Sequence, residues 1–103
     1  MTYKLVVTKH TADLLDGLLE HLLYRLRSRQ AAQHLLRCVE ETIERIKENP
    51  HQFPASRDRY LAKSGYHEAV TGDMHYVVIF NISDDTVTVA GIFHQLEDYP
   101  SKL

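Results

Sequence analysis

A chain of 103 residues with 44% apolar and 25% charged residues has the size and composition of one ordinary globular domain, residues 1–103, and can close a core without disulfides or metal. No apolar run approaches the roughly 18 residues that a membrane span requires. The net charge of −2 is unevenly distributed: residues 1–63 carry eleven basic and eight acidic residues, a net of +3, and residues 64–103 carry one basic and six acidic residues, a net of −5. The negative charge of the C-terminal half argues against an extended nucleic-acid binding surface there.

The N-terminal half is predicted to form one strand and two helices. Tyr3–Val7 is rich in β-branched and aromatic residues, which is typical of a strand. Thr8 is a suitable N-cap for a helix that ends near Leu26, and Ser28 is a suitable N-cap for a second helix that ends near Glu48. Because both helices are amphipathic and their connection is short, we expect an antiparallel helical hairpin.

The C-terminal half is predicted to form the remaining strands. Residues 51–65 read as a loop with one short turn near Arg59–Lys63, and Tyr66–Val70 reads as a short strand. Two apolar runs in Met74–His94 flank Ser83-Asp84-Asp85 and predict a β-hairpin, followed by a tail or short helical turn over residues 95–103. The order β-α-α-β-β-β predicts an α+β domain with the helical hairpin on one face of an antiparallel sheet.

The second arm of the β-hairpin alternates between two kinds of residue. We expect Val87, Val89 and Phe93 to face the helices, which places His94 on the opposite, open face together with Thr86, Thr88 and Ile92. A bulge at Gly91 would reverse this assignment for the residues that follow.

Cysteine content and the first residues of the chain bear on location. The N-terminal MTYKLVV lacks the long apolar run of a signal peptide. The one cysteine, Cys38, falls in the second helix and is read as a buried apolar residue in a reducing compartment. We therefore expect a cytoplasmic protein with no membrane partner.

Short phrases follow one another along almost the whole chain in a recognisable order: Ala12-Asp13-Leu14, Ala31-Ala32, Asn49-Pro50, Phe53-Pro54, Arg57-Asp58, Gly65-Tyr66, Tyr76-Val77-Val78-Ile79-Phe80 and Asp98-Tyr99. Together with the order of elements, they make the chain resemble the RelE/ParE superfamily, the toxins of bacterial type II toxin–antitoxin modules, which include plasmid-stabilisation proteins. The resemblance implies a cognate antitoxin as partner, and the leucines of residues 14–26 offer a strip on which a partner helix could dock.

The resemblance also implies growth inhibition by one of two routes, namely ribosome-dependent mRNA cleavage or inhibition of DNA gyrase. This chain has His67-Glu68 where relatives often carry arginine after the Gly-Tyr pair. It also has Gln95-Leu96-Glu97 before Asp98-Tyr99 where many relatives carry arginines. Arginines at such positions would hold phosphate in an mRNA-cleaving toxin.

RNA cleavage by an internal 2′-hydroxyl needs a base, an acid and a cation. The candidate catalytic residues are His94, Tyr99, Glu68 and Arg57, and the side chains that could complete such a site are His67, His75 and Arg59. The alternative is that His94 ends a strand and forms only local hydrogen bonds. The seven histidines and one cysteine show no spacing typical of zinc, so no metal or cofactor is predicted.

The acidic C-terminal half and the missing arginines favour a ParE-like inhibitor that acts by binding, or an attenuated toxin. Two alternatives stay open. One is a RelE-like mRNA endoribonuclease that uses His94 and Tyr99, and the other is a non-toxic binding module of the same fold.

Overall fold

The computed structural model describes residues 2–72, 75–96 and 99–103, so Met74 of the predicted hairpin and Asp98 of the family phrase lie outside the described residues. The elements are, in order, β1 (Lys4–Val7), α1 (Lys9–Glu20) running into a π-helical turn (His21–Arg25), α2 (Arg29–Glu48), a 3₁₀ turn (Pro50–Gln52), α3 (Arg59–Lys63), β2 (Tyr66–Thr71), β3 (Tyr76–Ser83), β4 (Thr86–His94) and a last 3₁₀ turn (Tyr99–Lys102). The predicted order of long helices and strands is confirmed.

Both predicted helix starts are confirmed by their capping hydrogen bonds. The Thr8 hydroxyl accepts from the Thr11 amide at 3.1 Å, and the Ser28 hydroxyl accepts from the Ala31 amide at 3.1 Å. Each cap satisfies an amide that the helix itself leaves without a partner. The two helices therefore begin at positions that the sequence specifies locally.

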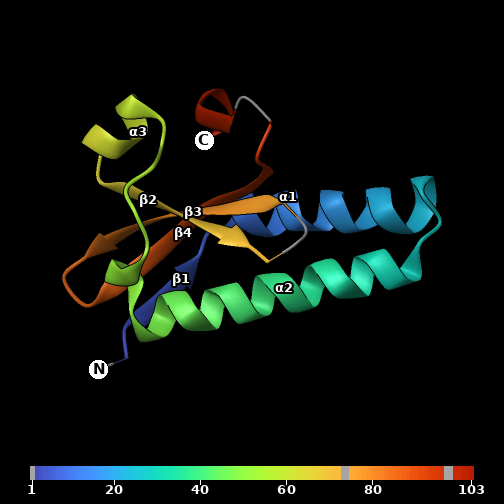
Figure 1. Ribbon diagram of the computed structural model, residues 1–103, viewed down its shortest axis with the longest axis horizontal. Coiled ribbons are helices and arrows are strands. Elements are labelled where there is room, and N and C mark those ends of the chain that lie inside the picture. Colours follow the sequence, from blue (N-terminus) through green and yellow to red (C-terminus); the bar gives the residue numbers. More distant parts are fainter. Residues whose placement is uncertain (1, 73–74, 97–98) are drawn as a thin grey trace.

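The four strands form one sheet in the order β1-β4-β3-β2 (Figure 1). Strands β2, β3 and β4 are antiparallel as predicted, but β1 pairs in parallel with β4, from Lys4 opposite Thr86 to Val7 opposite Val89. The sheet is thus mixed rather than wholly antiparallel. Side-chain alternation tells which face of a strand is buried, but it carries no information on strand direction.

A β-bulge in β4 overturns the predicted facing of its last residues. Ile79 pairs with Gly91 and Phe80 pairs with Val89, so Ala90 is the extra residue in β4. Because side chains alternate with a period of two, one extra residue exchanges the faces of everything that follows. Ile92 therefore packs on the helix side and Phe93 on the other side, and both predictions were wrong.

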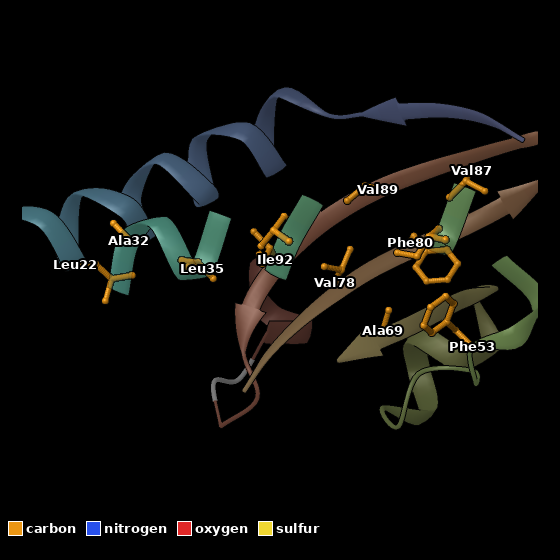
Figure 2. Packing of buried hydrophobic residues seen from close by; sticks show 12 residues of the cluster. Leu22, Ala32, Leu35, Phe53, Ala69, Val78, Phe80, Val87, Val89 and Ile92 are labelled. Carbon is orange, nitrogen blue, oxygen red and sulfur yellow. The ribbon is translucent and has the colours of Figure 1, made fainter. Parts of the chain in front are cut away.

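The sheet has a core on each face. The larger core lies between the sheet and the hairpin of α1 and α2 (Figure 2), and its buried residues are Leu22, Ala32, Leu35, Val39, Ile46, Phe53, Ala69, Val78, Phe80, Val87, Val89 and Ile92. The smaller core lies under α3 and the C-terminal turn, on the other side of the sheet from α2 (Figure 1), and is formed by Leu61, Val77, Ile79, Phe93 and Tyr99. Cover on both faces explains why β3 is apolar almost throughout.

Candidate functional site

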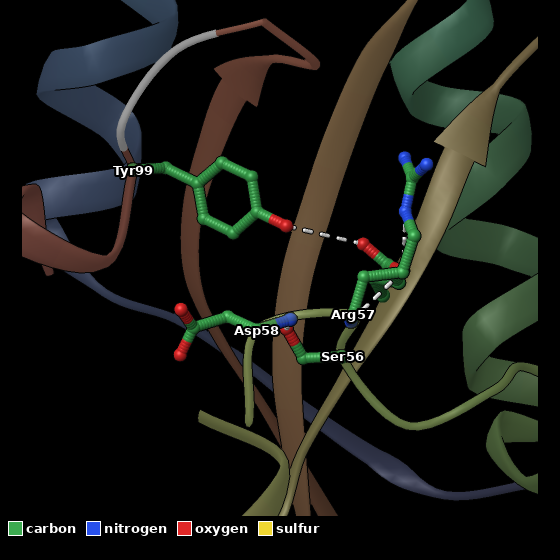
Figure 3. A network of polar contacts seen from close by, with 5 residues as sticks. Ser56, Arg57, Asp58 and Tyr99 are labelled. Carbon is green, nitrogen blue, oxygen red and sulfur yellow. Dashed lines mark hydrogen bonds and ion pairs between the residues drawn. The ribbon is translucent and has the colours of Figure 1, made fainter. Parts of the chain in front are cut away.

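The carboxylate of Glu68 is the centre of a polar network on the smaller-core face. Glu68 lies on β2 and its side chain is only 4% exposed. Its Oε1 accepts from the backbone N–H of Arg57 and from the Arg57 guanidinium Nε–H, each at 3.1 Å. Its Oε2 accepts from the Tyr99 hydroxyl at 3.3 Å (Figure 3). Three of the four predicted catalytic residues are therefore brought together.

The loop before α3 is held against β2 by its backbone. The Ser56 amide donates to the Tyr66 carbonyl at 3.0 Å, and the Glu68 amide donates to the Pro54 carbonyl at 3.1 Å. Ser56 is itself buried, and its hydroxyl accepts from the Asp58 amide at 3.2 Å. These bonds fix Arg57 beside Glu68. Sequence reasoning did not identify Ser56, because a single serine in a loop carries no pattern.

Tyr99 reaches the network from the C-terminal turn. Its ring stacks on Phe93 with centroids 5.7 Å apart and an angle of 17° between the planes. The bulge in β4 is what turns Phe93 toward this face, so the bulge also positions Tyr99.

The surroundings of Tyr99 keep its hydroxyl protonated. Burial of the ring raises the pKa of Tyr99 above the ordinary 10.0, the negative charge of Glu68 raises it further, and Ser56 and Arg57 act in the opposite direction. A protonated phenol can donate to Glu68, but it cannot serve as a base near neutral pH. The arrangement therefore pairs a buried carboxylate with donors from two separate segments.

His94 does not join this network. It is the last residue of β4 and pairs with Tyr76, whose side chain packs against the helix-side core, so His94 lies on the face opposite to its predicted one. Its Nδ1 accepts from the Leu96 amide at 3.1 Å, and its ring meets the Tyr76 ring edge-on at 5.5 Å. The local hydrogen bond that was the alternative expectation is present.

The other predicted residues are also dispersed. His67 lies on the helix side of β2, where its Nδ1 is 3.2 Å from the Phe53 carbonyl and its ring stacks on Phe80. His75 is exposed, with a left-handed backbone, and Arg59 is the exposed first residue of α3. In the parts of the chain that the structure describes, no three His, Cys, Asp or Glu side chains are grouped to hold a metal ion.

A shallow hollow of about 520 Å³ borders the network. Its lining residues are Phe53, Pro54, Ala55, Arg57, Glu68, Val70 and Gln95. The Arg57 side chain is 68% exposed, so its guanidinium can meet an anion from solvent while its Nε stays bonded to Glu68. The hollow thus has the Arg57 guanidinium beside the Glu68 carboxylate, both oxygens of which already accept hydrogen bonds.

Within the described residues, no helix is both long enough and apolar enough to cross a membrane. This observation applies to α2, the longest helix, as well as to α1.

One family model matches most of this chain, and two solved structures share its fold. Residues 5–99 match the family described as the ParE toxin of the type II toxin–antitoxin system parDE. The fold is similar to a structure of the chromosomal ParDE system from P. aeruginosa, with a TM-score of 0.74 at 15% identity over 90% of this chain and 96% of that one. It is also similar to a structure of the RelBE2 toxin–antitoxin complex from Mycobacterium tuberculosis, with a TM-score of 0.59 at 21% identity over 91% of this chain and 99% of that one. No curated protein matches the sequence significantly. The resemblance to the RelE/ParE superfamily is thus confirmed, and the chain belongs to the ParE toxin family of type II toxin–antitoxin systems.

Proposed function

We propose that this toxin arrests bacterial growth by binding DNA gyrase, and that a cognate antitoxin neutralises it by binding. Membership of the ParE family supports a toxin, and the two similar structures are described as parts of toxin–antitoxin systems. In this proposal the protein acts through surface contact and has no chemistry of its own.

The dispersal of the groups that RNA cleavage would need carries the proposal. A 2′-hydroxyl attack requires a base and an acid on either side of one phosphate. Here His94 and Glu68 lie on opposite faces of the sheet, and both oxygens of Glu68 already accept hydrogen bonds. The net charge of −5 in residues 64–103 adds an electrostatic cost to bringing RNA onto this half.

A RelE-like mRNA endoribonuclease is the second candidate, and one observation favours it. The exposed Arg57 guanidinium borders a hollow beside Glu68 and Tyr99, so a phosphate could approach a cation there. Such an enzyme would have to recruit its base from elsewhere, because the raised pKa of Tyr99 keeps that hydroxyl protonated.

Growth and target assays separate the candidates. The chain is expressed from a tight promoter in bacteria with and without its antitoxin, ribosome-bound mRNA is checked for cleavage, and the purified toxin is added to a gyrase supercoiling reaction. We expect arrest without antitoxin, intact transcripts and inhibited supercoiling. Intact supercoiling with cleaved transcripts would select the endoribonuclease, and no arrest would select a non-toxic module.

The variant His94→Ala tests the same question at residue level. We expect it to keep growth arrest within about twofold of the wild-type strength, because the contacts of His94 with Leu96 and Tyr76 lie on the face of the sheet opposite to Glu68. His51→Ala is the matched control, since His51 is an exposed histidine whose ring meets Tyr3 edge-on at 6.0 Å. Loss of arrest in His94→Ala but not in His51→Ala would refute the binding mechanism.

A further inference from the structure

The helical tip, residues 21–30, projects beyond the sheet at the far end of the helical hairpin (Figure 1). Large apolar side chains of this segment are exposed. Tyr24 is 76% exposed and Leu26 is 59% exposed, while Leu23 is also exposed. Only Leu22 of this segment is buried in the core. Exposed tyrosine and leucine side chains grouped at one end of a molecule mark a contact surface rather than a random scatter.

The same tip is positively charged. Arg25, Arg27 and Arg29 lie within it, and the sequence has no acidic residue between Glu20 and Glu40. Among the described residues, none of these three arginines forms an ion pair. Their charges are therefore available to an outside partner, on a protein whose other half is acidic.

Two shallow hollows meet at Tyr24. One, of about 440 Å³, is lined by Leu23, Tyr24, Arg27 and Arg29. The other, of about 290 Å³, is lined by Gly17, Glu20, His21, Tyr24 and Arg25. An exposed tyrosine with arginines on both sides has the composition of the residues that carry most binding energy in protein interfaces.

The backbone of the tip holds an arginine where a glycine would be easier to accommodate. The Leu26 amide donates to the His21 carbonyl and the Ser28 amide to the Leu22 carbonyl, which closes the helix end. Arg27 then adopts a φ of +49°, the left-handed position that glycine usually occupies after a helix. A side chain kept at a strained position is often retained for its function.

We propose that the helical tip is the surface with which this toxin binds its target, and that the target's binding surface has an acidic rim around an apolar centre. The proposal rests on the proposed function in taking gyrase as that target. The charge of the tip requires an acidic partner, and the leucines require apolar contact, which a phosphate backbone does not offer. A protein surface satisfies both requirements.

Arg27→Gly is the decisive variant, because it relieves backbone strain while it removes one charge. We expect its melting temperature to be unchanged or up to about 5 °C higher. We expect gyrase inhibition to weaken about tenfold, and Tyr24→Ala to weaken it at least as much. A toxin that becomes no less stable but less active has lost a contact, not its fold.

Two control variants match Arg27→Gly. Asp84→Gly relieves a similar left-handed residue, with φ of +54°, in the β3–β4 turn, and Lys63→Gln removes an exposed charge on α3. Both should inhibit gyrase like the wild type. Full inhibition by Arg27→Gly and Tyr24→Ala together would overturn the proposal.

Other outcomes are equally distinct. If the wild type does not inhibit gyrase, the proposed function fails. Loss of growth arrest in Arg27→Gly and not in Lys63→Gln would then still support the helical tip as the surface that binds another target. Three results would overturn the inference. The tip variants could lose antitoxin binding but keep gyrase inhibition, or the wild type could bind duplex DNA in a gel-shift assay that Arg27→Gly abolishes. The third is a wild-type dimer, measured by sedimentation, that the tip variants no longer form.

Discussion

The hydroxyl of Tyr99 is expected to stabilise the fold by closing the C-terminal turn onto β2, and Tyr99→Phe removes only that hydroxyl. A hydrogen bond to a charged group contributes about 1.5–3 kcal/mol, and the O···O distance of 3.3 Å places this one at the lower end, about 1.5 kcal/mol. The ring and its stacking on Phe93 remain. Urea denaturation should therefore show a loss of about 1.5 kcal/mol.

The effect should depend on pH in one direction. The pKa of Tyr99 is raised in the folded chain above 10.0, so the unfolded chain loses this proton first as pH rises. The stabilisation is complete below about pH 10 and is lost as pH rises through the raised pKa. The difference between wild type and Tyr99→Phe should consequently be constant up to pH 9 and shrink above pH 10, roughly in step with phenol ionisation.

Tyr60→Phe is the control, because Tyr60 is an exposed tyrosine on α3. This substitution should change the free energy of unfolding by less than about 0.5 kcal/mol. A difference between wild type and Tyr99→Phe that is zero, or that does not shrink in alkali, would refute the account of this network.

Two further substitutions test the fold. Gly91→Ala should lower the free energy of unfolding by about 2 kcal/mol, because the added Cβ would lie 2.5 Å from Cε2 of buried Phe93 and 3.0 Å from Cδ2 of Leu103. Chemical denaturation measures this loss. A variant as stable as the wild type would show that the Phe93 ring can move aside without cost. Ser28→Ala should cost about 1 kcal/mol by removing the cap on the Ala31 amide, while Ser28→Asp should retain most of the stability; equal losses in the two variants would show that the cap is not the cause.

The sequence predicted correctly those structural features that are determined by a few adjacent residues. The caps at Thr8 and Ser28, and the turn at Asp84-Asp85, each depend on a few adjacent residues, and each is found where it was predicted. The two apolar runs correctly indicated the β3–β4 hairpin. Such features need no knowledge of distant contacts.

The sequence-based prediction was wrong where one extra residue changes the alternation of side chains along a strand, and where strands far apart in the sequence pair. The extra Ala90 in β4 exchanged the faces of Ile92, Phe93 and His94, and only Gly91 gave a hint of it. Of the site, the sequence named Glu68, Arg57 and Tyr99, but it could not show that they bond to one another. Their contact depends on the packing of three separate segments.

The parallel pairing of β1 with β4 has a consequence for how the toxin comes into being. Lys4 finds its partner only when Thr86 has been synthesised, so β1, the first of the described strands, must wait for β4, the last of them, before the sheet is complete. A chain whose synthesis stops before β4 has neither that edge nor the central partner of β3. We therefore expect a fragment that ends before β4 to be unfolded rather than to act as a smaller toxin, because β1 and β3 both lack their pairing partner in it.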